Sequence, residues 1–260
     1  MWLSLILVIC SDPGISLYRF NKPPDSPIFI DIAPTTQSSA KNPVVRDIES
    51  RLDNPEKYND LITYVHEGTH SINSAYRNKY GGRNNALYEL NGKLAVALEP
   101  SITLRLVAES VPGVLRGSKY YLYMQQQQKY WNDRPLYIFD EWVAYLNGLE
   151  VAVTGSAPNN RDISKDIEAT AEFFVYAAVL CEQSYTKYMN GRELRQVQAI
   201  MFWHTRRMLM LLHKCRKRGY DCSKADKILL TFRKSLFCIQ LRIFTSAFLG
   251  KQWCKINMGF

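Results

Sequence analysis

The sequence predicts an α+β chain that is mostly helical, with a small sheet and a helical C-terminal part. Apolar residues recur at three- and four-residue spacing through most segments after residue 54, which is the pattern of amphipathic helices. Segments with strand character are few and short, and the best of them are Ile28–Ile32 and Ile102–Val107. With 260 residues, of which 47% are hydrophobic, the chain is long enough to bury a full core.

Residues 1–11 have the character of a short secretory signal. Trp2–Ile9 is a predominantly apolar run, and Ser11 is a small residue in a position suited to cleavage. The run is far shorter than the roughly 20 apolar residues that a membrane-spanning helix needs. We therefore expect a secreted protein or one located in the cell envelope, such as the periplasm. The alternative is that residues 1–11 form a buried strand of a cytoplasmic protein.

The segment up to residue 48 is expected to be mostly extended, because its prolines forbid long helices. A strand is expected at Ile28–Ile32. A helix is then expected to begin at Asn54 and Pro55, since Asn is a good capping residue and Pro suits the first helical position. This helix should run to about Tyr76.

The predicted helix contains the motif His-Glu-x-x-His. On a helix, His66 and His70 lie one turn apart on the same face, so their two imidazoles can bind one Zn²⁺ ion. Glu67 is the next residue round the helix and can reach a water molecule at the open position of the metal. We predict a catalytic zinc site with Glu67 as the general base. The alternative is a surface helix whose two histidines bind nothing.

The segments after the motif helix alternate between predicted helix and strand. A helix is expected over Ala86–Leu98, where four leucines are spaced along one face. A strand is expected at Ile102–Val107, and Lys119–Met124 fits either a second strand or the start of a helix. Two further helices are expected, one from Tyr137 to Leu149 and one from about residue 164 to Tyr185.

The C-terminal region, residues 191–260, is predicted to be helical and basic. It holds 15 Lys and Arg residues against three Asp and Glu, a net charge of +12, whereas residues 1–190 hold 18 against 21, a net of −3. Amphipathic stretches are expected at Arg195–Arg218 and Asp226–Leu249. The region could bind an acidic partner or an anionic surface, or its cations could simply line solvent-facing helices. Nucleic acid is not favoured, because no nucleic-acid-binding signature accompanies the charge.

A catalytic zinc site needs a third protein ligand, and the residues just after His70 offer no further histidine. Glu141 is the first candidate, because it lies in an otherwise apolar helix where an ionised carboxylate needs a partner. Asp140 beside it could orient a ligand histidine. Three other residues remain open as the third ligand: His204, Glu168 and Glu172.

The pentapeptide at 66–70, His-Glu-Gly-Thr-His, with Glu141 far downstream on another helix, resembles the gluzincin branch of the zincin metallopeptidases. The resemblance covers the two motif helices, a few dozen residues. It implies a zincin-like fold with a small sheet packed beside the motif helix. In this reading, residues 12–190 form the catalytic domain, and residues 191–260 pack on the same domain.

The resemblance also implies a reaction. One Zn²⁺ ion would activate a water molecule, and Glu67 would take its proton and pass it to the leaving amine of a peptide or protein substrate. Ile102–Val107 could be the edge strand that pairs with the substrate. Tyr145 could stabilise the oxyanion, because it lies one turn after Glu141, although it could equally be a packed core tyrosine.

Two alternatives to a peptidase stay open. One is a zinc hydrolase that acts on a non-protein amide, such as a peptide crosslink of a cell wall. The other is a binding protein in which the zinc site is structural or inactive and the basic C-terminal helices hold a partner.

Overall fold

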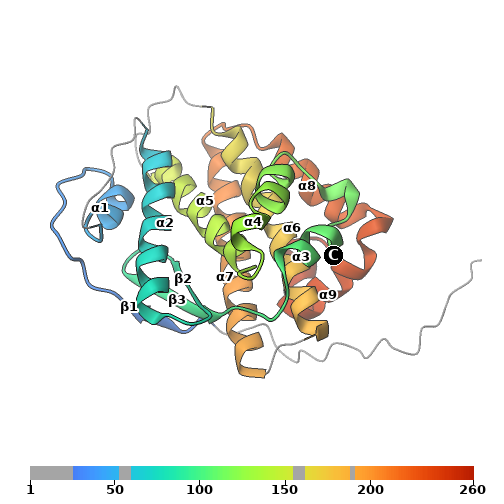
Figure 1. Cartoon of the computed structure of the whole chain (residues 1–260). Coiled ribbons are helices and arrows are strands. Elements are labelled where there is room, and N and C mark those ends of the chain that lie inside the picture. Colours follow the sequence, from blue (N-terminus) through green and yellow to red (C-terminus); the bar gives the residue numbers. More distant parts are fainter. Residues whose placement is uncertain (1–25, 53–59, 155–161, 188–190) are drawn as a thin grey trace, which may run out of the picture.

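The computed structural model describes residues 26–52, 60–154, 162–187 and 191–260. Within these ranges the chain is mostly helical and has one small antiparallel sheet, which confirms the predicted α+β class (Figure 1). The predictions of a signal in residues 1–11 and of a helix cap at Asn54 concern segments outside the described residues. No described helix combines the length and the apolar character that a membrane crossing requires.

The first half of the described chain contains the whole sheet. Its elements are β1 (Phe29–Asp31), α1 (Pro43–Glu49), α2 (Leu61–Tyr80), β2 (Asn84–Tyr88), β3 (Lys93–Leu98), α3 (Leu104–Ser110), the 3-10 turn η1 (Gly113–Leu115), the π-helical turn η2 (Tyr120–Gln126) and α4 (Gln128–Trp131).

The second half is helical. Its elements are α5 (Tyr137–Thr154), α6 (Ser164–Lys187), α7 (Gly191–Lys217), α8 (Ser223–Lys234), the 3-10 turn η3 (Leu236–Cys238), α9 (Ile239–Leu249) and α10 (Lys251–Asn257).

Helix α2 carries the His-Glu-x-x-His motif, as predicted. The side chain of Asp60 accepts hydrogen bonds from the backbone N–H groups of Ile62 and Thr63, which satisfies two of the donors at the start of the helix. At the other end, Gly81 has a φ of 63°, a left-handed conformation that favours glycine and stops the helix.

The predicted helix over Ala86–Leu98 is wrong, because this segment forms the hairpin β2–β3. Three consecutive residues, Leu90, Asn91 and Gly92, have positive φ and turn the chain back on itself. Asn-Gly is a common hairpin turn because both residues tolerate this conformation. The regular leucine spacing was misleading, since Leu87 and Leu94 are buried on opposite strands of the hairpin.

The predicted strand at Ile102–Val107 is also wrong. Thr103 caps helix α3 by accepting a hydrogen bond from the backbone N–H of Leu106, and Leu104 and Val107 are buried at helical spacing. The segment therefore cannot act as an edge strand for a substrate. Lys119–Met124, for which a strand or a helix start was expected, lies mostly in the helical turn η2.

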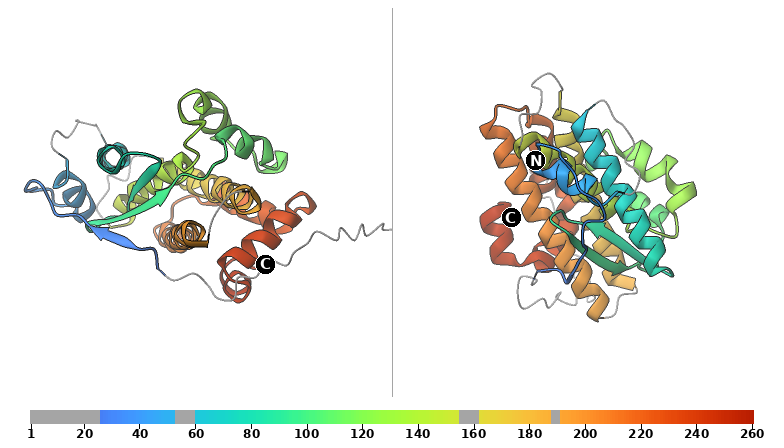
Figure 2. Two further views of the ribbon diagram at one scale, coloured as in Figure 1. Left: turned by 60° about the horizontal axis from the view of Figure 1, so that its bottom comes forward. Right: turned by 90° about the vertical axis from the view of Figure 1, so that its left-hand side faces the viewer.

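The sheet has the strand order β1-β3-β2, with both pairs antiparallel. In the left view of Figure 2, α2 lies on one side of the sheet and α7 on the other. Trp203 of α7 packs edge-on against Phe29 of β1, and Gln196 of the same helix donates to the carbonyl of Val96 in β3. The sheet is thus held between the motif helix and the first helix of the basic region.

Helix α5 is the centre of the core, and it packs against α2, α6 and α7. Every residue from Tyr137 to Leu149 is buried, which explains why the sequence of this predicted helix is almost continuously apolar. The predicted helices near 164–185 and 195–218 are present as α6 and α7. The predicted stretch Asp226–Leu249 is two helices, because the extended backbone of Ser235 ends α8 before α9 begins.

Two glycines let neighbouring helices approach the motif. A Cβ at Gly148 of α5 would lie 3.2 Å from the backbone oxygen of Ile62 and 3.9 Å from the Cβ of His66. On another side of α2, a Cβ at Gly68 would lie 2.5 Å from Cγ2 of Ile48 in α1. These positions hold the histidine-bearing turn between α1 and α5.

Gly68→Ala is expected to overpack the contact between α1 and α2, at a cost of about 1–3 kcal/mol that a helix-propensity gain of about 1 kcal/mol partly offsets. In an Ile48→Ala background the same change should cost about 1–2 kcal/mol less, because the added methyl group then has space. Urea unfolding of the four proteins measures this coupling. Purely additive effects would contradict the contact.

Candidate metal centre

Three potential metal ligands converge where α2 packs on α5. His66 and His70 lie on α2, and Glu141 lies in the first half of α5. The Nε2 atoms of the two histidines are 3.1 Å apart, and Oε2 of Glu141 is 3.7 Å from the first and 3.5 Å from the second. One ligand atom from each residue lies within 4.8 Å of the others. The structure therefore brings together the three residues predicted as ligands.

The chemistry of this cluster fits a zinc ion. Two imidazole nitrogens and one carboxylate oxygen are a donor set that zinc commonly takes in enzymes. Oε2 of Glu141 is buried and has no hydrogen-bond partner, although buried carboxylate oxygens normally have one. Among the described residues this is the one group of His, Cys, Asp and Glu side chains arranged to hold a metal ion.

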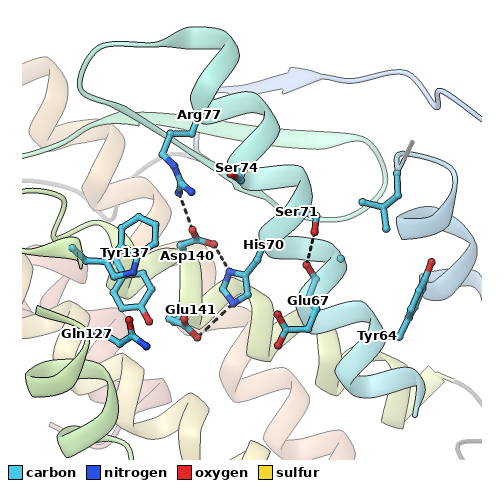
Figure 3. Close-up of a pocket in the computed structure, with 13 residues that line it drawn as sticks. Tyr64, Glu67, His70, Ser71, Ser74, Arg77, Gln127, Tyr137, Asp140 and Glu141 are labelled. Carbon is cyan, nitrogen blue, oxygen red and sulfur yellow. Dashed lines mark hydrogen bonds and ion pairs between the residues drawn. The ribbon is translucent and has the colours of Figure 1, made fainter. Parts of the chain in front are cut away.

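Asp140 orients His70, as the sequence predicts. Its Oδ1 atom lies 2.8 Å from Nδ1 of His70, so this nitrogen donates to the carboxylate and Nε2 is directed at the cluster (Figure 3). Burial alone would lower the pKa of His70, but the carboxylates of Asp140 and Glu141 raise it well above its ordinary value.

Asp140 is itself held by two residues of α2. Asn73 Nδ2 donates to its Oδ1 at 2.7 Å, and Arg77 Nη1 donates to its Oδ2 at 3.1 Å. Burial acts to raise the pKa of Asp140, but His70 and these two donors outweigh it and keep the pKa below its ordinary value. The carboxylate is therefore ionised although it is buried.

The support continues from Arg77 into the sheet. Arg77 Nη1 also lies 3.4 Å from Oδ1 of Asn85 in β2, whose Nδ2 donates to Glu99 at 3.0 Å. The guanidinium group of Arg77 stacks over the ring of Trp131, 5.0 Å from its centroid. Glu99 accepts from the backbone N–H of Leu136, and burial raises its pKa to about 7. A polar chain thus links the sheet to the start of α5 and to His70.

A second buried network holds the opposite side of the motif. Asn147 of α5 donates to Oγ1 of Thr69, which lies inside the motif, and to the carbonyl of Tyr88 in β2. Arg207 of α7 donates to Oδ1 of Asn147 at 2.9 Å and to Glu89 at 3.0 Å. Arg207 therefore belongs to the basic region by sequence but is buried and helps to hold the motif helix.

The cluster borders a cavity of about 570 Å³. Glu67 faces this cavity beside His70 and Glu141 (Figure 3). The rest of the lining is largely polar and aromatic, and comprises Leu52, Tyr64, Gly68, Ser71, Ser74, Arg77, Gln127, Trp131, Tyr137 and Asp140. A small polar substrate segment could therefore reach the histidine and the two glutamates together.

Tyr145 lies close to the cluster but is not among the cavity-lining residues. Its ring packs edge-on against His66 with centroids 4.5 Å apart, and its hydroxyl is 2.9 Å from that of Tyr123. Tyr137, which was not among the predicted site residues, lines the cavity, and its hydroxyl is hydrogen-bonded to Glu141. Its position four residues before Glu141 on one helix was the signal that could have found it.

The other candidates for a third ligand are engaged elsewhere. His204 is fully buried and bonded through Nε2 to Glu89. Glu172 accepts hydrogen bonds from Ser118 and from the hydroxyl of Tyr176, and Glu168 pairs with Lys224 at 3.5 Å. Glu141 is the carboxylate that joins the two motif histidines.

Comparisons with protein-family models, with curated proteins and with solved structures found no significant match.

Arg77→Met is expected to lower the free energy of unfolding by about 3–5 kcal/mol, because it leaves Oδ2 of the buried Asp140 carboxylate without its guanidinium partner. The loss should shrink in an Asp140→Asn background, where no charge is left unpaired. Denaturant unfolding in the presence of chelator measures both effects without a contribution from bound metal.

The matched control is Arg105→Met, which removes the exposed partner of Glu109 on α3. It should leave stability unchanged, because exposed ion pairs contribute little. Equal small effects of the two Arg→Met changes would contradict a structural role for the Arg77–Asp140 pair.

Proposed function

We propose that this chain is a zinc-dependent metallopeptidase with a zincin-like catalytic domain. The observation that carries the proposal is the convergence of His66, His70 and Glu141, whose Oε2 has no hydrogen-bond partner, beside a cavity that His70, Glu141 and Glu67 line. The position of Asp140 behind His70 supports it further, because ligand histidines usually donate their other N–H to a carboxylate.

His66, His70 and Glu141 would hold the zinc ion. When bound, zinc would supply a Lewis acid that polarises a carbonyl oxygen and lowers the pKa of a water molecule. Asp140 keeps His70 in the tautomer that presents Nε2, and Arg77 and Asn73 keep Asp140 ionised and in place.

Glu67 would move the proton. Its carboxylate would accept a proton from the attacking water and return it to the nitrogen of the leaving amine, so that the peptide bond is cleaved without net proton release at that residue. Tyr137 lines the same cavity and could donate its hydroxyl proton in a hydrogen bond to the developing oxyanion. Tyr145 is the less suitable donor, because it is not among the residues that line the cavity.

The geometry favours a catalytic over a structural site. Structural zinc sites are closed by four protein ligands, whereas catalytic sites have three and leave one position open. Three ligands converge here among the described residues, beside a cavity. Peptides are the proposed substrates. If the substrate is a non-protein amide instead, the same residues would form the site and only the substrate would differ.

Glu141→Gln is expected to weaken zinc binding by more than the roughly 10–100-fold that loss of an outer-shell partner causes. Metal analysis after dialysis against a competing chelator measures the affinity. Glu168→Gln is the matched control on α6 and should keep stoichiometric zinc. Zinc retained in the first variant and lost in the second would move the third ligand to Glu168.

Glu67→Gln is expected to keep zinc bound and to lower kcat by about 10²–10⁴-fold, because it removes the general base and leaves the ligands. Cleavage of a proteome-derived peptide library, read by mass spectrometry with and without 1,10-phenanthroline, measures the activity. Unchanged cleavage by this variant would exclude the proposed mechanism. Stoichiometric zinc with no cleavage of any peptide by the unmodified protein would point to another amide substrate or to a binding role.

A further inference from the structure

The corner between α8 and α9 exposes large apolar side chains. Leu236 and Phe237 of η3 are each 78% exposed, the highest value among the large hydrophobic residues that the structure describes. Ile239 and Ile243, one turn apart on α9, are 39% and 47% exposed. We call Leu236, Phe237, Ile239 and Ile243 the apolar corner. Isolated exposed apolar residues are ordinary, but four within eight positions form a patch.

Backbone groups at the corner form hydrogen bonds with side chains of the same segment. Arg242 Nη1 donates to the carbonyls of Phe232 and Ser235, at 2.9 and 2.6 Å. The hydroxyl of Ser235 accepts from the backbone N–H of Phe237 at 3.2 Å. Phe232 and Cys238, on either side, are fully buried and anchor the turn. These contacts hold the turn in place and reduce the cost of removing its backbone from water.

The sequence on both sides of the corner is strongly cationic. Residues 223–260 hold seven Lys and Arg against a single acidic residue, Asp226, which pairs with Arg216. Arg233 and Lys234 immediately precede the corner and are exposed, and Lys251 and Lys255 are exposed on α10. In Figure 1 this part of the chain lies at the opposite end of the molecule from α1.

We propose that the apolar corner is a docking surface for an anionic lipid bilayer. Leu236 and Phe237 enter the boundary between headgroups and acyl chains, and the flanking Lys and Arg residues contact the anionic headgroups. Two adjacent side chains that protrude from a tight turn would need a matching pocket in a protein partner, whereas a bilayer accepts them without one. This inference is independent of the proposed peptidase function.

Sedimentation of the full chain with vesicles tests the proposal. Binding is expected to vesicles of phosphatidylcholine that contain phosphatidylserine and to be much weaker with phosphatidylcholine alone. The double variant Leu236→Ser/Phe237→Ser should lower the affinity for the mixed vesicles by about tenfold or more, because it removes the inserted apolar surface. Thermal unfolding should be unchanged, since both side chains are exposed.

The matched control is Val114→Ser/Tyr121→Ser, which removes two side chains that are 50% and 63% exposed elsewhere. It should bind the mixed vesicles as the unmodified chain does, and so should Glu67→Gln. Absence of binding to the mixed vesicles would overturn the proposal. Binding that depends on salt but is unaffected by the double variant would also overturn it, because it would show electrostatic adsorption through the basic region without insertion of the corner.

A second measurement reports insertion directly. Phe237→Trp places an indole at the corner, and its emission, obtained by difference from the unmodified chain, is expected to shift to shorter wavelength when mixed vesicles are added. Tyr121→Trp is the control and should show no shift. A shift of equal size at both positions would contradict insertion through the corner.

Discussion

The ion pair between Asp140 and Arg77 is the interaction on which the rest of the site depends. It joins the start of α5 to the last turn of α2, and both partners are buried. Because a buried charge without a partner is costly, the two helices can pack at this place only when the pair forms. His70 then shares the same carboxylate, so the contact that stabilises the helix pair also fixes the tautomer of a candidate ligand.

Helix α2 is supported on different sides by different means. Gly68 and Gly148 allow close apolar packing against α1 and α5, which leaves little freedom for the turn that carries the histidines. Buried polar networks connect the same helix to the hairpin and to α7, through Asn73 and Thr69. The remaining side of α2 lines the cavity. The site is therefore built on regular elements whose side chains are held by packing and hydrogen bonds, which suits a group that must keep its geometry.

The site was more predictable from the sequence than the sheet was. The i and i+4 spacing of His66 and His70 is a local property of any helix, and the cost of burying Glu141 is visible in its apolar neighbours. Residues 86–98 could not be assigned from leucine spacing alone, because that spacing fits a helix as well as the observed hairpin, and the Asn91-Gly92 turn decides between them. Arg77 could not be linked to Asp140 in advance, since their contact depends on the packing of two helices far apart in sequence.

The separation of the candidate ligands along the chain would have a consequence for metal uptake. Seventy residues lie between His70 and Glu141, and they include the hairpin and the segments α3 to α4. During synthesis the histidine pair emerges well before the carboxylates, so the nascent chain offers two imidazoles without the third donor. If the cluster binds a metal ion as proposed, high-affinity capture would have to wait for the long-range contact between α2 and α5, so metal loading would be a late event that reports completed folding.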